Sequence, residues 1–253
     1  MKEADGKVLG GMKLLGKGWR MYALHVGTYL LLMIFAVLAL ALISAIAVFV
    51  IAPGGPRMNL REVWMGMGTL QKLGIFVLFL LSLAVFYRAL AGSMLATNEF
   101  SEGREIGAIE AFRRVRWKHT RLFWLMMAGM FFGPLAPFAV LIAGFFLASA
   151  FPTAVMEDLG VFQALKRGEK LGVGNQLRIA TIYVAYLVAA TGVGAAIFAV
   201  LALVQDQFGN AWYVKPVPSI GFLFFFTVVQ WYMIVLTLNY LQQRRKLTES
   251  QLS

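Results

Sequence analysis

The chain has 253 residues, of which 60% are hydrophobic and only 14% are charged, with a net charge of +11 and no cysteine. A soluble domain carries roughly 45–50% apolar and about 25% charged residues, so this composition argues against a water-soluble fold and for long apolar segments placed in lipid. The lack of cysteine excludes disulfide bonds, thiolate metal sites and a cysteine nucleophile.

Several apolar runs are long enough to cross a bilayer, which takes roughly 20 helical residues. The clear ones are residues 26–52, 74–96, 179–204 and 220–241. A further region, 122–155, is too long for one ordinary span and barely long enough for two. Pro134 and Pro137 lie near its middle, and two prolines so close break a helix. We therefore predict two short spans there, about 118–132 and 138–156, and six spans in all.

The positions of the charges indicate which way the spans run. Lysine and arginine gather in four segments, at residues 2–20, 104–121, 166–178 and 244–246. The other connecting segments hold only Arg57, Arg61, Lys72 and Lys215. Cytoplasmic loops carry the excess of basic residues, so we predict a multi-pass membrane protein with both termini in the cytoplasm. The same bias explains the net charge without a nucleic-acid partner.

Each basic segment that precedes a pair of spans is predicted to form an amphipathic helix at the membrane surface. Its apolar residues recur at helical spacing beside basic ones, and such a helix can lie in the headgroup region with its apolar side down. The three apolar stripes are Val8, Met12, Leu15, Trp19 and Tyr22; Ile106, Ile109, Phe112 and Val115; and Leu159, Phe162 and Leu165.

The second and third of these segments align with each other. Ile106-Gly107 matches Leu159-Gly160, and Ala111-Phe112-Arg113-Arg114 matches Ala164-Leu165-Lys166-Arg167, while the first segment matches more loosely. The predicted fold class is all-α: one domain, 1–253, a polytopic bundle of six transmembrane helices. It contains three repeats of a surface helix plus a hairpin, at 8–105, 106–158 and 159–246. The alternative is that any basic segment before a span shows this pattern.

Short motifs in these segments resemble those of a known group of proteins. The patterns are Gly107-x-x-Glu110-Ala111-Phe112-Arg113-Arg114, Phe151-Pro152-x-Ala154-Val155-x-Glu157-Asp158 and Asn239-Tyr240-Leu241-x-x-Arg244-Arg245. They are similar to motifs of small six-span bacterial proteins, a group that includes the membrane domain attached to some glycerophosphodiester phosphodiesterases. The resemblance implies a helical inner-membrane module with no reaction of its own, because the chemistry of the fused proteins resides in a separate soluble barrel.

No catalytic, cofactor or metal site is predicted. The only histidines, His25 and His119, lie where basic segments enter spans, and neither has a second histidine or a carboxylate at ligand spacing. Both are therefore predicted to be interfacial side chains. No aspartate or glutamate lies within a predicted span, which argues against proton- or sodium-coupled transport.

Arg88 is the one charged residue inside the four clear spans. An arginine at the bilayer centre costs about 2.5–3.5 kcal/mol, so it is a candidate functional residue. Arg88 is, however, about eight residues from the cytoplasmic end of its span, or roughly 12 Å along a helix, and it can reach toward the headgroups. The alternatives are a snorkelling or helix-bonding side chain and a site that holds an anionic lipid or substrate group.

The sequence favours a non-enzymatic scaffold or accessory subunit that binds anionic lipid headgroups. The candidate contacts for lipid or another anion are Arg88, Arg113, Arg114, Lys166 and Arg167. A membrane-protein partner or a second copy of the chain is expected beside the lipids. The alternative is a permease-like or lipid-handling protein with a cavity near Arg88 and Gln230, whereas a packed centre would favour the scaffold. A membrane enzyme is the weakest hypothesis, because no nucleophile, base and metal converge.

Overall fold

The computed structural model describes residues 10–51, 66–116, 148–208 and 217–252, and all regular secondary structure in these ranges is helical. The all-α prediction is thereby confirmed for them. Residues 148–156 are also helical. The helices with defined bounds are α1 (Gly11–Leu24), α2 (Val26–Ile51), α4 (Thr69–Ser101), α5 (Ala108–Arg114), α8 (Val161–Gly172), α9 (Gln176–Phe208) and α10 (Val217–Leu252).

Two helices of the described ranges are long and apolar enough to cross a membrane: α4, and α9 over Gln176–Val204. A third candidate is the pair Gly11–Leu24 and Val26–Leu38, whose two halves meet at an angle of 85°. These helices confirm that the chain has segments able to span a bilayer. The count of six stays a prediction, because the proposed span 118–132 and most of 138–156 lie outside the described residues, as does His119.

The surface of α9 shows what kind of solvent this fold needs. Its side chains Val184, Val188, Phe198 and Leu203 are all exposed. Apolar side chains uncovered along a whole helix are typical of a surface that faces lipid, because hydrocarbon solvates them and water does not.

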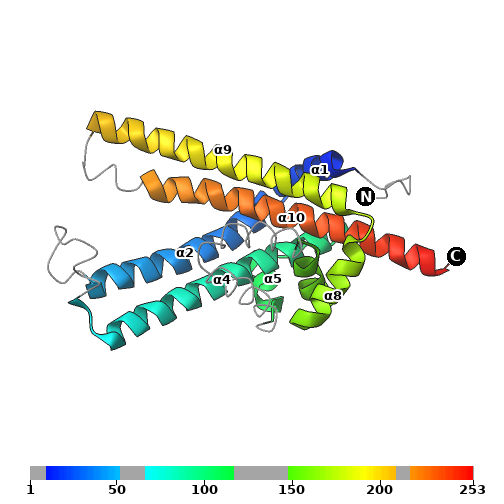
Figure 1. Cartoon of the computed structure of the whole chain (residues 1–253), viewed down its shortest axis with the longest axis horizontal. Coiled ribbons are helices and arrows are strands. Elements are labelled where there is room, and N and C mark those ends of the chain that lie inside the picture. Colours follow the sequence, from blue (N-terminus) through cyan, green and yellow to red (C-terminus); the bar gives the residue numbers. More distant parts are fainter. Residues whose placement is uncertain (1–9, 52–65, 117–147, 209–216, 253) are drawn as a thin grey trace.

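The long helices form two hairpins that share one core (Figure 1). In one hairpin α2 packs against α4, and in the other α9 packs against α10, while α10 also packs on α4 and α2. The main apolar cluster draws from all four helices and includes Tyr29, Leu32, Ala96, Ile182 and Ile234. A second cluster joins α4 to the helix at 148–156 and to α8, and it includes Tyr87, Met94, Phe151, Ala154 and Ala164.

The three short helices α1, α5 and α8 lie toward the same end of the bundle as the C-terminal end of α10 (Figure 1). We call this the basic end. There α5 packs on α2 and α4, and α8 packs on α10 and on Ala150 of the helix at 148–156. In contrast, α1 packs on α9 and α10, the hairpin at the opposite end of the sequence. The side of the membrane on which the basic end lies stays a prediction.

Candidate functional site

The three surface helices begin in the same way. Each follows a glycine with extended backbone: Gly10 (φ −64°, ψ 162°), Gly107 (φ −77°, ψ 153°) and Gly160 (φ −70°, ψ 164°). We number positions from this glycine, which is position 0. The residue at position 4 is buried in all three helices: Leu14, Ala111 and Ala164. The residue at position 8 is also buried: Gly18 and Gly168 lie one turn later on the same face, while Val115 directly follows the last residue of α5. The same face of each helix therefore docks on the bundle.

This docking face divides the apolar stripes that the sequence predicts. Ile106 and Val115 are 5% and 1% exposed and pack against protein, whereas Ile109 of the same stripe is 60% exposed. The prediction that the whole stripe faces lipid was therefore wrong for part of it. The reason is that a protein interior and a lipid tail both accept apolar side chains, so periodicity alone does not distinguish them.

Glycine at position 8 lets two of these helices approach the bundle closely. A Cβ atom added at Gly168 would lie 2.8 Å from the backbone nitrogen of Ala150. A Cβ atom added at Gly18 would lie 2.4 Å from Cγ2 of Val235 in α10. These contacts hold α8 and α1 at distances that a larger residue would increase.

Arg88 of α4 binds the C-terminal end of α5. Its Nε donates to the main-chain oxygen of Phe112 at 3.0 Å, and its Nη2 donates to that of Arg113 at 3.4 Å. The last carbonyls of a helix lack intrahelical donors and carry partial negative charge, so a cation there is favourable. Among the alternatives that the sequence left open, the structure shows the bond to a neighbouring helix. The other alternative, a site at Arg88 for an anionic lipid or substrate group, stays open.

Arg114 and Arg167 occupy position 7 of their helices, and both form ion pairs with a glutamate of the bundle. Arg114 Nη1 lies 3.2 Å from Glu99 of α4, and Arg167 Nε lies 3.3 Å from Glu157, just after the helix at 148–156. Glu157 also accepts a 2.8 Å hydrogen bond from the hydroxyl of Tyr240. Both arginines thus fasten surface helices to the bundle. Sequence reasoning missed the two glutamates, although the matched position of the arginines was visible.

Arg113 and Lys166 occupy position 6, one residue earlier, and they point away from the bundle. Both side chains are exposed, and neither forms an ion pair within the described ranges. The four basic residues predicted on α5 and α8 therefore separate into two kinds. One pair is engaged by protein carboxylates, and the other presents its charge outward.

A buried polar network joins α2, α4 and α10 in the centre of the bundle. The hydroxyl of Tyr29 lies 2.9 Å from Oγ1 of Thr97. The side-chain amide of Gln230 donates to the main-chain oxygen of Tyr29 at 2.7 Å and to Oγ of Ser93 at 2.8 Å. Gln230 thus makes the interhelical hydrogen bonds expected of a polar residue in a span.

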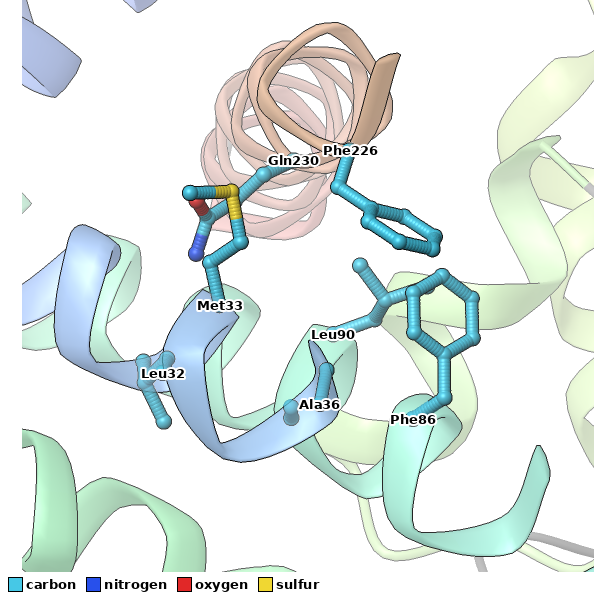
Figure 2. Close-up of a pocket in the computed structure, with 8 residues that line it drawn as sticks. Leu32, Met33, Ala36, Phe86, Leu90, Phe226 and Gln230 are labelled. Atoms are coloured by element: carbon cyan, nitrogen blue, oxygen red, sulfur yellow. The ribbon is translucent and has the colours of Figure 1, made fainter. Parts of the chain in front are cut away.

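A small hollow lies beside this network (Figure 2). Its interior measures about 10 Å³, room for about one water molecule, and Gln230 is the one polar side chain among the residues that line it. Arg88 is not among them, although its neighbours Ala89 and Leu90 are. Sites for small molecules usually measure roughly 300–1,000 Å³, so the hollow is small for a ligand. The lining residues are Leu32, Met33, Ala36, Phe86, Ala89, Leu90, Phe226 and Gln230.

The described ranges contain no group of three or more histidine, aspartate or glutamate side chains placed to hold a metal ion. His25 lies at the bend between α1 and α2 and stacks on Phe100 of α4, with the ring centroids 3.7 Å apart. Its surroundings are those of a packed side chain at the end of a helix.

Comparison with known proteins identifies no relative of this chain. No family model, curated protein or solved structure matches the chain. The resemblance to six-span bacterial proteins therefore stays a prediction that rests on the short motifs alone.

Proposed function

We propose that this chain is a non-enzymatic module of the membrane that binds anionic lipid headgroups through its basic end and serves as a scaffold or accessory subunit of a membrane complex. One observation carries the proposal. Arg113 and Lys166 present their charges outward at the same position of two surface helices, while the arginines beside them are paired with glutamates. A cation near an anionic membrane surface contributes about 1 kcal/mol of binding free energy.

The proposal includes six spans in the bacterial inner membrane, with both termini in the cytoplasm. The gathering of α1, α5 and α8 at one end of the bundle supports this orientation, because cytoplasmic segments carry the basic residues. The proposed threefold repeat is supported by the shared register of the three surface helices, each with an extended glycine and buried residues at positions 4 and 8.

A permease-like or lipid-handling protein is the second candidate, and the hollow beside Gln230 is the observation in its favour. Two observations weigh against it. The guanidinium of Arg88 binds the end of α5 instead of lining the hollow, and the side-chain nitrogen of Gln230 is engaged by Tyr29 and Ser93. We therefore favour the scaffold.

The experiment compares two double variants that remove the same charge. In one, Arg113 and Lys166 become glutamine; in the other, Arg57 and Arg61, which the sequence predicts on the opposite side of the membrane, become glutamine. Binding of phosphatidylglycerol to the purified proteins is measured by native mass spectrometry. Two cations contribute about 2 kcal/mol together, so the first variant should bind roughly 30-fold more weakly. Equal binding by both variants would refute the headgroup site.

The scaffold role has its own test. The full-length chain is purified in mild detergent after crosslinking in cells, and the proteins that accompany it are identified. A partner or a second copy at a fixed ratio would support the role. A chain recovered alone under all crosslinking conditions would contradict it.

A further inference from the structure

Three large apolar side chains are exposed at the same position of the three surface helices. Met12, Ile109 and Phe162 all lie at position 2, two residues after the extended glycine. They are 74%, 60% and 83% exposed. One exposed apolar residue needs no explanation, but the same exposure at one position of three separate helices is a pattern.

The residues around position 2 form an ordered sequence of faces around each helix. Position 5 lies three residues on and is therefore on the same side. It is occupied by Leu15, Phe112 and Leu165, which are apolar and partly buried at the edge of the docking face. Positions 5 and 2 together form an apolar strip, in which position 5 contacts the bundle and position 2 is exposed.

The other side of position 2 is basic. Position 6 lies one turn on from position 2, and it holds the outward cations Arg113 in α5 and Lys166 in α8. In α1 this position is Gly16, and the exposed cations are Lys13 and Arg20 instead. Around each helix the surface thus changes from protein contact to exposed apolar residue to exposed cation.

We propose that Met12, Ile109 and Phe162 are lipid anchors, whose side chains enter the boundary between headgroups and acyl chains while the adjacent cations bind headgroup phosphates. The order of the faces fits this location, because an interfacial helix has hydrocarbon on one side and charged headgroups and water on the other. The inference rests on the proposed attachment of the basic end to an anionic leaflet, and it adds the residues that enter the lipid.

The arrangement of the three helices favours lipid over a protein as the occupant. The helix α5 packs on α2 and α4, α8 packs on α10 and the helix at 148–156, and α1 packs on α9 and α10. The three anchors are thus carried by different parts of the bundle. Lipid surrounds a bundle and can reach each of them, whereas one protein partner would need a continuous patch.

The chain has no cysteine, so single cysteines can be introduced without changing a background sequence. The test variants are Met12→Cys, Ile109→Cys and Phe162→Cys. The matched controls are Glu110→Cys and Gln163→Cys, the exposed residues that directly follow the anchors Ile109 and Phe162. Each full-length variant carries a nitroxide spin label and is reconstituted in vesicles of phosphatidylglycerol and phosphatidylcholine.

Collisions of the label with oxygen, which concentrates in lipid, and with a water-soluble nickel chelate report its surroundings. The anchors should show a ratio of oxygen to nickel accessibility several-fold above that of the controls. Labels at position 2 that meet the nickel chelate as often as the controls would overturn the inference, because the side chains would then lie in water. Labels shielded from both reagents would also overturn it, since a protein would then cover them.

Vesicles of phosphatidylcholine alone separate this inference from the proposed function. Anchors that stay in lipid there would support the inference even if the anionic preference of Arg113 and Lys166 failed. Anchors exposed to water in both kinds of vesicle would overturn the inference, even if phosphatidylglycerol binding still depended on the two cations.

Discussion

Arg88 and Phe112 are joined in two ways: the Nε of Arg88 donates to the main-chain oxygen of Phe112 at 3.0 Å, and its guanidinium carbon lies 4.8 Å from the centroid of the same residue's ring. One residue of α5 thus supplies both an acceptor and a π face to the cation. The costly charge inside a predicted span is compensated by this pair of contacts.

Replacement of Arg88 should therefore affect stability and not lipid binding. Hydrogen bonds from a charged donor are worth about 1.5–3 kcal/mol, so Arg88→Leu should lose roughly that free energy of unfolding in detergent. Arg88→Lys keeps the charge but lacks the planar guanidinium, so its free energy of unfolding should fall by less than that of Arg88→Leu. Phosphatidylglycerol binding by native mass spectrometry should be unchanged. A stable Arg88→Leu protein that has lost its lipid would contradict this assignment.

Two glycines of α8 give a matched pair for testing the docking of that helix. At Gly168 a Cβ atom would meet backbone atoms of Ala150 at 2.8 Å, while at Gly172 it would meet nothing nearer than 3.8 Å. Gly168→Ala gains about 1 kcal/mol of helix propensity inside α8, whereas Gly172→Ala gains less because Gly172 is the last residue of the helix. Gly168→Ala also incurs overpacking of about 1–3 kcal/mol against the backbone of Ala150, so it should be the less stable of the two. Equal midpoints of thermal unfolding would show that α8 does not dock as described.

The buried network is expected to act as one unit. Gln230→Leu and Ser93→Ala each remove one partner of a 2.8 Å hydrogen bond. Interhelical hydrogen bonds in membrane proteins average about 0.6 kcal/mol and reach about 1.7 kcal/mol, so a double-mutant cycle should give a coupling energy in that range. The unfolding free energies come from titration with a denaturing detergent. Strictly additive effects would mean that the two side chains do not interact.

The ion pairs of the surface helices should be weak and sensitive to salt. The Arg167 side chain is 38% exposed, so its pair with Glu157 contributes no more than about 1 kcal/mol. Arg167→Gln should lower the midpoint of thermal unfolding at low salt. The difference in midpoint from the unaltered protein should shrink at 1 M salt, because salt then screens the attraction between exposed charges over about 3 Å. Lys166→Gln is the control, since its side chain has no such partner in the described ranges. A salt-independent loss in Arg167→Gln would point to packing as the cause.

Apolar run length and periodicity are sufficient to predict the helices. The predicted spans 74–96 and 179–204 fall within α4 and α9, and the three predicted surface segments overlap α1, α5 and α8. These features follow from local sequence, because a helix satisfies its own backbone and the bilayer fixes its length. The glycines at 107 and 160 mark where two surface helices begin, as their alignment indicates.

The partners of the polar residues could not be predicted in this way. Arg88 is bonded to a carbonyl 24 residues away, and Arg167 to a glutamate 10 residues before it, and nothing in the spacing requires either contact. The same limit applies to the apolar stripe that contains Ile106 and Ile109. One of them packs on protein and the other is exposed, although both have the same chemistry.

The position of α1 has a consequence for biosynthesis. This helix is translated before α9 and α10, yet it packs on both of them. Until these two helices have been made, Gly18 of α1 lacks its contact with Val235 of α10. The docking of α1 therefore has to wait for the synthesis of helices about 150 residues later in the chain, and chains released before that point would leave it undocked.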